Sequence, residues 1–182
     1  MELILQPFLQ LYRELQFTPY AYISNKNYNS CFQRNYVIFI INTSTILLNI
    51  KPLNMDNNSI YMNNINRKLL NITVNSINKY LYYNYSIMPI DIIIFNINMI
   101  GSYKININVK ELNELIKTKY NHLIIQNNVI IPIEYNNTIL KLTSNNFNIL
   151  NNITQLYFES TNINIILSNN MIFICNINKN TC

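Results

Sequence analysis

Hydrophobic and polar residues alternate over short stretches along most of this chain. Asparagines separate Phe95, Ile97 and Met99 from one another, and Ile105 and Ile107 follow the same pattern. A period of two places every second side chain on one face of a β-strand. The pattern predicts a mainly β chain, with strands near residues 20–25, 36–41, 45–50, 58–62, 77–85, 95–99, 105–109, 122–126, 128–134, 137–143, 153–158, 162–167 and 171–177.

One segment has the spacing of an amphipathic helix instead. In "NVKELNELIKTKY", which starts at Asn108, the residues Val109, Leu112, Ile116 and Lys119 recur at intervals of three and four and form one stripe. The first residue of this segment is a suitable N-cap, because its side chain can accept hydrogen bonds from the first free N–H groups. We expect this to be the main helix.

The first 17 residues have a different character from the rest. From Pro7 onward, an apolar face at helical spacing can be drawn through Leu3, Phe8, Leu11, Tyr12 and Leu15. Residues 1–17 are therefore expected to be a leader with a possible helix.

Asparagine is expected to form the turns. The chain contains 38 Asn and 35 Ile but one Gly, and Asn tolerates positive φ better than most residues. The pairs Asn127-Asn128, Asn136-Asn137 and Asn169-Asn170 lie where turns are expected, and Gly101 is placed for a turn that needs positive φ.

A break in the strand pattern near residues 86–91 predicts a boundary between two β-rich lobes. The first lobe is expected at 18–86 and the second, which contains the main helix, at 87–182.

The charge distribution favours a protein partner over a nucleic acid. The formal net charge is +5, and the thirteen basic residues are spread thinly from Arg13 to Lys179. Nucleic-acid binders usually cluster such residues. Arg67 and Lys68 are the only adjacent basic pair, in a polar segment that we interpret as a turn. Two cations on a turn attract and orient an acidic partner.

No catalytic or metal-binding motif is recognisable. One glycine is too few for a phosphate-binding loop or a dinucleotide fingerprint. The cysteines form no CxxC pair and are interpreted as reduced thiols, and no run reaches the roughly 18 apolar residues of a membrane span. A small hydrolase is the alternative from the enzyme class, and it would require Asp91, His122 and Glu134 to converge.

The order of segments resembles the N-terminal domain of N-ethylmaleimide-sensitive factor (NSF), an AAA ATPase that disassembles SNARE complexes. "YVIFII" and "ILLNIKPL" are similar to its opening strands, and "SIYMNNINRKLLNITVNSINKYLYY" to its strand, basic turn and following strand. "DIIIFNINMI", "VKELNELIKTKYNHLIIQNNVIIPIEYNNTILKLTS" and "YFESTNINIILSNNMIFICNI" resemble its second lobe. The resemblance covers residues 18 to 178.

This resemblance implies a double-ψ β-barrel lobe followed by a smaller α/β lobe, which is non-catalytic and binds SNAP adaptors, and through them SNARE complexes. Arg67 and Lys68 correspond to the family's basic loop, Lys104 to its inter-lobe basic position, and Arg13 to its N-terminal basic contact. The acidic region of the adaptor would meet these residues in the groove between the lobes.

The same resemblance implies a cytoplasmic protein that is peripheral to Golgi and transport-vesicle membranes. The sequence stops at Cys182, about where a linker to the first ATPase ring would begin, so ATP, Mg²⁺ and a hexamer are expected only with ATPase domains. No nucleic acid, cofactor or metal is expected for this chain. An alternative is the N domain of a valosin-containing-protein-like, Ufd-type or peroxisome-biogenesis AAA system, which binds ubiquitin-related adaptors.

Overall fold

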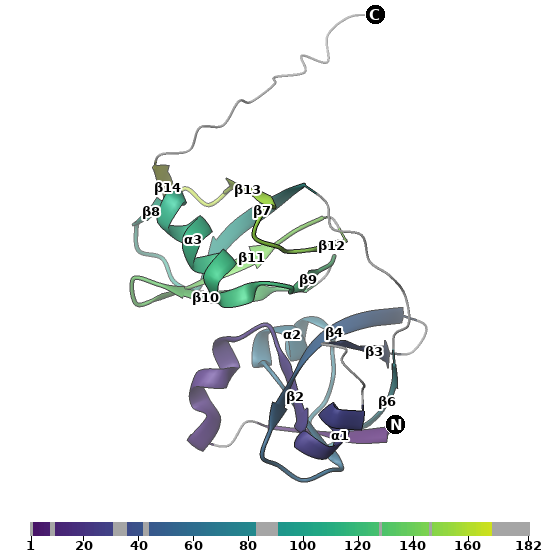
Figure 1. Ribbon diagram of the computed structural model, residues 1–182. Helices are drawn as coiled ribbons and strands as arrows, with labels where there is room; N and C mark the ends of the chain where they lie inside the picture. Colours follow the sequence, from purple (N-terminus) through teal and green to yellow (C-terminus); the bar gives the residue numbers. More distant parts are fainter. Residues whose placement is uncertain are drawn as a thin grey trace, which may run out of the picture.

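The protein is mainly β, with mixed parallel and antiparallel sheets and few helices, as the sequence predicts. The computed structural model describes residues 2–7, 10–30, 36–41, 44–82, 91–127, 129–145 and 147–168. Figure 1 shows two lobes, the lower built from β1–β6 and the upper from β7–β14 with helix α3. In the described part of the chain, no helix has the length and apolar character needed to cross a bilayer.

The barrel lobe is a sheet that closes on itself. Its strands pair in the order β1-β5-β2-β4-β3-β6, and β6 returns to pair with β1. The pairs β1/β5 and β2/β4 are parallel, and the other four are antiparallel. The elements of this lobe are β1 (Glu2–Gln6), η1 (Gln10–Phe17), β2 (Ala21–Ser24), α1 (Asn25–Ser30), β3 (Tyr36–Ile41), β4 (Ser44–Leu53), β5 (Ser59–Met62), α2 (Asn64–Leu69) and β6 (Ile77–Tyr82).

The first residues belong to this barrel, which corrects the expectation of a leader. Strand β1 pairs with β5 and β6, and it buries Leu3 and Leu5 among the barrel core residues. Leu3 therefore alternates with exposed Glu2 as a strand residue and is not part of a helical face. The possible helix is confirmed only for η1, a 3-10 helix.

The basic pair lies on a helix, not on the turn that we predicted. Helix α2 begins after Asn63, whose side-chain Oδ1 accepts a 2.7 Å hydrogen bond from the N–H of Asn66. Arg67 and Lys68 lie in its last turn, where cations interact favourably with the helix dipole. A six-residue helix in a polar segment has too short a periodic pattern to be distinguished from a turn.

The α/β lobe consists of one four-stranded sheet, two strand pairs and one long helix. The sheet has the order β10-β11-β7-β13, and the pairs are β12/β9 and β14/β8. Its elements are β7 (Ile92–Met99), β8 (Ile105–Asn108), α3 (Val109–Tyr120), β9 (Ile124–Ile125), β10 (Ile131–Tyr135), β11 (Thr138–Thr143), β12 (Asn148–Ile149), β13 (Gln155–Glu159) and β14 (Ile165–Ser168).

Helix α3 is confirmed where the sequence predicted it. The side chain of Asn108 accepts hydrogen bonds from the N–H groups of Lys110 and Glu111, at 3.1 and 3.4 Å. The carboxylate of Glu111 in turn accepts hydrogen bonds from the side-chain amide of Asn108 and from the hydroxyl of Tyr135. This reciprocal arrangement fixes the start of the helix and ties it to β10.

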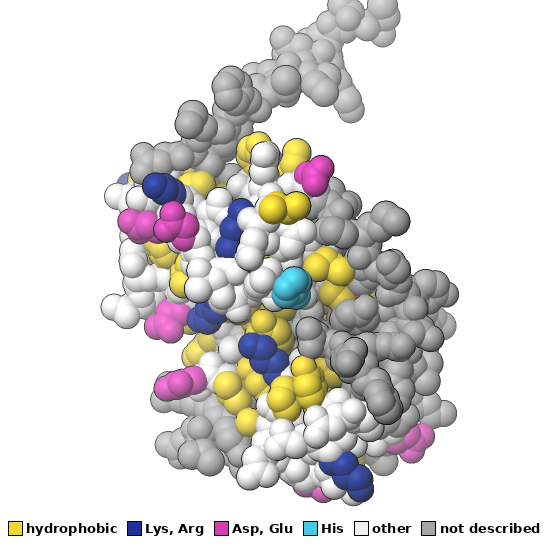
Figure 2. Space-filling model, viewed as in Figure 1, with side chains coloured by type: hydrophobic (Ala, Val, Ile, Leu, Met, Phe, Trp, Pro, Cys, Tyr) yellow, Lys and Arg dark blue, Asp and Glu magenta, His cyan; other side chains and the backbone are white. Residues whose placement is uncertain are grey.

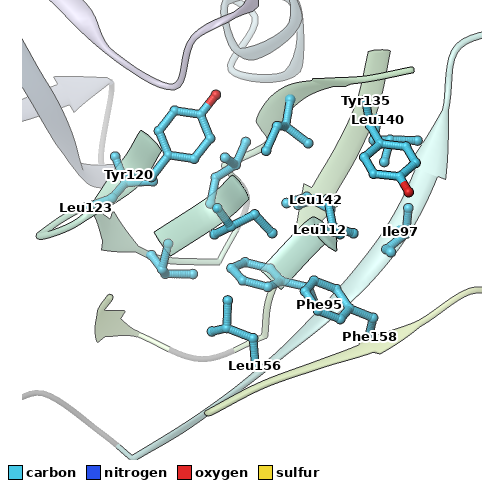
Figure 3. Packing of buried hydrophobic residues seen from close by; sticks show 14 of the residues in the cluster. Phe95, Ile97, Leu112, Tyr120, Leu123, Tyr135, Leu140, Leu142, Leu156 and Phe158 are labelled. Atoms are coloured by element: carbon cyan, nitrogen blue, oxygen red, sulfur yellow. The ribbon is translucent and has the colours of Figure 1, made fainter. Parts of the chain in front are cut away.

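The core of the α/β lobe extends into the barrel lobe. Phe95 and Phe158 stack with ring centroids 6.1 Å apart, under the helix residue Leu112 (Figure 3). The same hydrophobic cluster includes Tyr22 and Tyr61, which are paired on the outer surface of the barrel. Both faces of these barrel strands are therefore buried, one inside the barrel and the other between the lobes.

Two of the predicted turns are confirmed. Asn136 and Asn137 join β10 to β11 with φ values of 47° and 60°, and Gly101 has a φ of 127°. A Cβ atom on Gly101 would lie 2.8 Å from the ring of Tyr103. Asn128, the pair 169–170 and the strand expected at 171–177 lie outside the described residues.

The tight β10–β11 turn provides a test of the role of asparagine. Replacing Asn137 with Val should lower the free energy of unfolding by about 1–2 kcal/mol, because a β-branched residue is strained at positive φ. Asn137→Gly should not lower it, because glycine adopts this conformation without strain. Urea denaturation of both variants measures the difference, and an equal loss in both would contradict this explanation.

Candidate binding cleft between the lobes

Three buried side-chain amides join the two lobes. Asn49 of β4 donates to the carbonyl of Ile124 at 2.9 Å and accepts from its N–H at 2.7 Å. Asn66 of α2 makes the same pair of bonds with Ile130, at 2.8 and 2.7 Å. All three amide residues are at least nine-tenths buried.

In the third bridge the side chain belongs to the α/β lobe and the backbone groups belong to the barrel. Gln126 of the α/β lobe accepts from the N–H of Leu47 at 3.1 Å and donates to the carbonyl of the same residue. An amide carries one acceptor and two donors, so it can replace a neighbouring strand for one residue. The backbone groups at the seam are thereby satisfied, and the lobes are fixed in position.

Beside these bridges lies a cleft of about 210 Å³, here called the cationic cleft. Its lining comes from both lobes: β4, α1 and the residue before β2 on one side, and the end of α3 and the following turn on the other. The side chains that define it are Tyr20, Lys51, Thr118, Lys119, Asn121 and His122. In Figure 2 the imidazole, the only cyan side chain, lies at the level where the lobes meet, near Lys or Arg and hydrophobic side chains.

Two lysines flank a pair of tyrosine rings in this region. The Lys51 ammonium lies 3.9 Å from the ring centroid of Tyr20, and the Lys119 ammonium 5.9 Å from that of Tyr120. The two rings meet edge to face, with centroids 6.2 Å apart. A cation over an aromatic face is attracted by the negative charge of the ring face. The rings therefore hold both ammonium groups at the seam.

Burial changes the ionisation of these groups. Desolvation lowers the pKa of Lys51, because the charged form loses hydration. Burial, followed by the charge of Tyr22, raises the pKa of Tyr20 from 10.0 to about 12. Burial also raises the pKa of Tyr120, whose hydroxyl donates a 2.9 Å hydrogen bond to the carbonyl of Pro132. At neutral pH the tyrosines are uncharged hydrogen-bonding groups.

A second, larger cleft of about 590 Å³ lies between η1 and the α/β lobe. It has a mixed charge, because Glu14 and Glu134 line it together with Lys119. Lys119 therefore borders both clefts, and only this second one contains carboxylates among its described lining residues.

Arg67 and Lys68 lie next to the seam, because the residue before them, Asn66, forms one of the three bridges from α2 to the α/β lobe. Arg67 is half-buried and donates to the side chain of Asn64 and, at 3.4 Å, to the carbonyl of Ile72. Lys68 is exposed. Of the pair, Lys68 is the one whose charge faces solvent freely.

The other predicted contact residues are distributed around the molecule. Lys104 is exposed in the loop between β7 and β8, and Arg13 lies in η1, with a side chain outside the described part of the structure. Their roles in binding stay predictions. For the hydrolase alternative, His122 lines the cationic cleft, Glu134 lines the other cleft and Asp91 lines neither.

Sequence reasoning missed Lys51 as a site residue, and it noted Lys119 only as a member of the apolar stripe of α3. A lysine as the last member of an apolar stripe indicates that this face of α3 reaches a polar surface at the C-terminal end of the helix. The two lysines are 68 positions apart in the sequence, so no local pattern connects them. Only the packing of one lobe on the other brings both to the cationic cleft.

Comparison with known proteins gives no match for this chain, either among protein-family models or among curated proteins. The described residues also contain no group of three or more His, Cys, Asp or Glu side chains that could hold a metal ion. Cys31, Cys175 and Cys182 lie outside the described residues. The geometry of the seam is therefore the basis for a functional interpretation.

The amide bridges predict a specific dependence of stability on Asn49. Asn49→Leu should lower the free energy of unfolding by about 2–4 kcal/mol, because the N–H and the carbonyl of Ile124 lose their partner and stay buried. Asn98→Leu, a substitution at an exposed strand position, should change it by less than about 0.5 kcal/mol. Equal effects in urea denaturation would show that Asn49 does not brace the seam.

The buried tyrosines predict a loss of stability at alkaline pH. The pKa of Tyr20 is higher in the folded state than in the unfolded state, so its contribution is fully present below pH 10 and is lost as the pH rises through about 12. The urea midpoint should therefore fall over this range. Tyr20→Phe should reduce the fall, and Tyr103→Phe, at a position 54% exposed, should leave it unchanged. Identical profiles for all three proteins would contradict the assignment.

Proposed function

We propose that this chain is a non-catalytic adaptor-binding domain of an NSF-like AAA ATPase. In this role it recruits an acidic adaptor of the SNAP class, and through it SNARE complexes, for disassembly. The observation that carries the proposal is a braced seam between a closed barrel and an α/β lobe, with lysines from both lobes at its surface.

The barrel supports the proposal through its pairing pattern. Six strands close into a ring in which two parallel pairs, β1/β5 and β2/β4, occur among antiparallel ones. We propose that this ring is the double-ψ barrel that the resemblance implies. The α/β lobe that follows contains one long helix, in agreement with the same resemblance.

The exposed lysines of the two lobes support an acidic partner. Lys68 and Lys104 are exposed, and Lys51 and Lys119 line the cationic cleft. Within the described residues, none of these four side chains has a hydrogen bond or an ion pair. Surface charges of one sign accelerate and orient association with a partner of opposite charge.

Contacts at an exposed rim are individually weak, so the proposed role depends on several copies acting together. We propose that a hexamer formed by the ATPase domains supplies these copies. The working site of such an assembly is the cytoplasmic face of Golgi and transport-vesicle membranes, to which this domain is peripheral.

Reversing exposed charge should weaken adaptor binding. Lys68→Glu combined with Lys104→Glu should lower the affinity for an assembled SNAP–SNARE complex about tenfold at low salt, since each exposed pair contributes up to about 1 kcal/mol. The loss should shrink as salt increases. Arg67→Glu should also weaken binding, but it breaks the bond to Ile72 and so is expected to lower the melting temperature slightly.

Lys110→Glu combined with Lys141→Glu is the matched control, because it changes the net charge equally at lysines outside the proposed set of adaptor contacts. A pull-down and a titration of both double variants separate local from global charge effects. If both double variants bound the SNAP–SNARE complex equally well, Lys68 and Lys104 would not be contacts for SNAP. Binding of ubiquitin in place of SNAP, with the same dependence on Lys68, would favour the ubiquitin-related adaptor systems instead.

A further inference from the structure

The described lining of the cationic cleft contains two lysines and no carboxylate. Lys51 and Lys119 reach it from opposite lobes, and His122 lies on the turn after α3 with a φ of 65°. The carboxylates Glu14 and Glu134 line the second cleft, which Lys119 also borders. Lysines from both lobes therefore line one cleft.

The two lysines of the cationic cleft are exposed and lie near tyrosine rings. Desolvation lowers the pKa of Lys51, whose ammonium lies 3.9 Å from the ring centroid of Tyr20, and the Lys119 ammonium lies 5.9 Å from the ring centroid of Tyr120. The amide bridge of Asn49 to Ile124 holds the two lobes, and with them the two lysines, on opposite sides of one cleft. An anion bound in the cleft would be attracted by both ammonium groups.

We propose that the cationic cleft binds a phosphate-type oxyanion, either free in solution or carried on a side chain of a partner. Lys51 and Lys119 provide the charge, and His122, Thr118 and Asn121 provide hydrogen-bonding groups around it. This inference rests on the cleft alone and does not depend on the identity of the adaptor.

Charge and size distinguish this ligand from a carboxylate. A phosphate group carries about −1.5 to −2 charges at neutral pH and so balances two lysines, whereas a carboxylate balances one. Lysine is a common phosphate ligand because its ammonium acts as a point charge. The cleft has a volume of about 210 Å³, which is large enough for one tetrahedral oxyanion.

The single histidine of the chain provides a direct reporter. Adding inorganic phosphate at constant pH should shift the imidazole Hε1 resonance of His122 in a saturable manner, and potassium chloride of equal ionic strength should not. Lys51→Gln combined with Lys119→Gln should require at least about tenfold more phosphate, because both charges that hold the anion are removed. Lys110→Gln, which removes a charge outside the cleft, should behave like the unaltered protein.

Peptides distinguish the two sources of the anion. Saturation by a phosphoserine peptide at a lower concentration than inorganic phosphate indicates a group carried by a partner, and the reverse order indicates a free anion; both support the site. An equal shift with the peptide in which glutamate replaces phosphoserine would overturn the preference for phosphate. The proposal itself would be overturned if no probe shifted the resonance, or if the double lysine variant needed no more phosphate than the unaltered protein. The first of these outcomes is measured in the unaltered protein, so it does not depend on whether the variant folds. SNAP binding by the Lys68 and Lys104 variant is measured separately, so failure of one proposal is distinguishable from failure of the other.

Discussion

The arrangement of the two lobes depends on satisfying backbone groups where one lobe ends and the other begins. A buried N–H or carbonyl without a partner costs on the order of 1–3 kcal/mol, so a seam between two sheets needs either a shared strand or a substitute for one. Asn49, Asn66 and Gln126 are that substitute, because each amide binds both the N–H and the carbonyl of one residue opposite. The bridges follow one another along the seam, from the cationic cleft toward α2. Rotation of one lobe on the other would break them together.

Asparagine takes several structural roles that other proteins divide among different residues. Asn108 caps a helix, Asn136 and Asn137 adopt positive φ in a tight turn, and Asn49 replaces a strand. These roles rest on one property, a short side chain with a donor and an acceptor that can mimic a peptide group. A chain with 38 asparagines and one glycine can therefore still build caps, turns and buried contacts.

Local features of the fold could be predicted from the sequence, and features that depend on distant partners could not. The cap at Asn108 and the turn at Asn136 follow from short patterns, as do most strands. Strand β1 was missed because "ELILQ" shows its alternation only once β5 and β6 are known to lie beside it. The basic pair was found, but α2 was not, because its short helix depends on the cap at Asn63 and on the anchoring of Asn66 to Ile130. Lys51 and Lys119 were not combined, since their proximity exists only after the lobes pack.

The position of these two lysines follows from the same bridges. Lys51 is two residues beyond Asn49 on β4, and Lys119 is five residues before Ile124, so the first bridge draws both toward one cleft. The Tyr20 and Tyr120 rings then fill the space beneath the ammonium groups and stay uncharged, because burial raises the pKa of both phenols. None of the described residues that line this cleft is a carboxylate, whereas the second cleft, which Lys119 also borders, contains Glu14 and Glu134. The bracing of the seam and the lysines that line the cleft at its edge are therefore consequences of one arrangement, because the same packing of the lobes produces both.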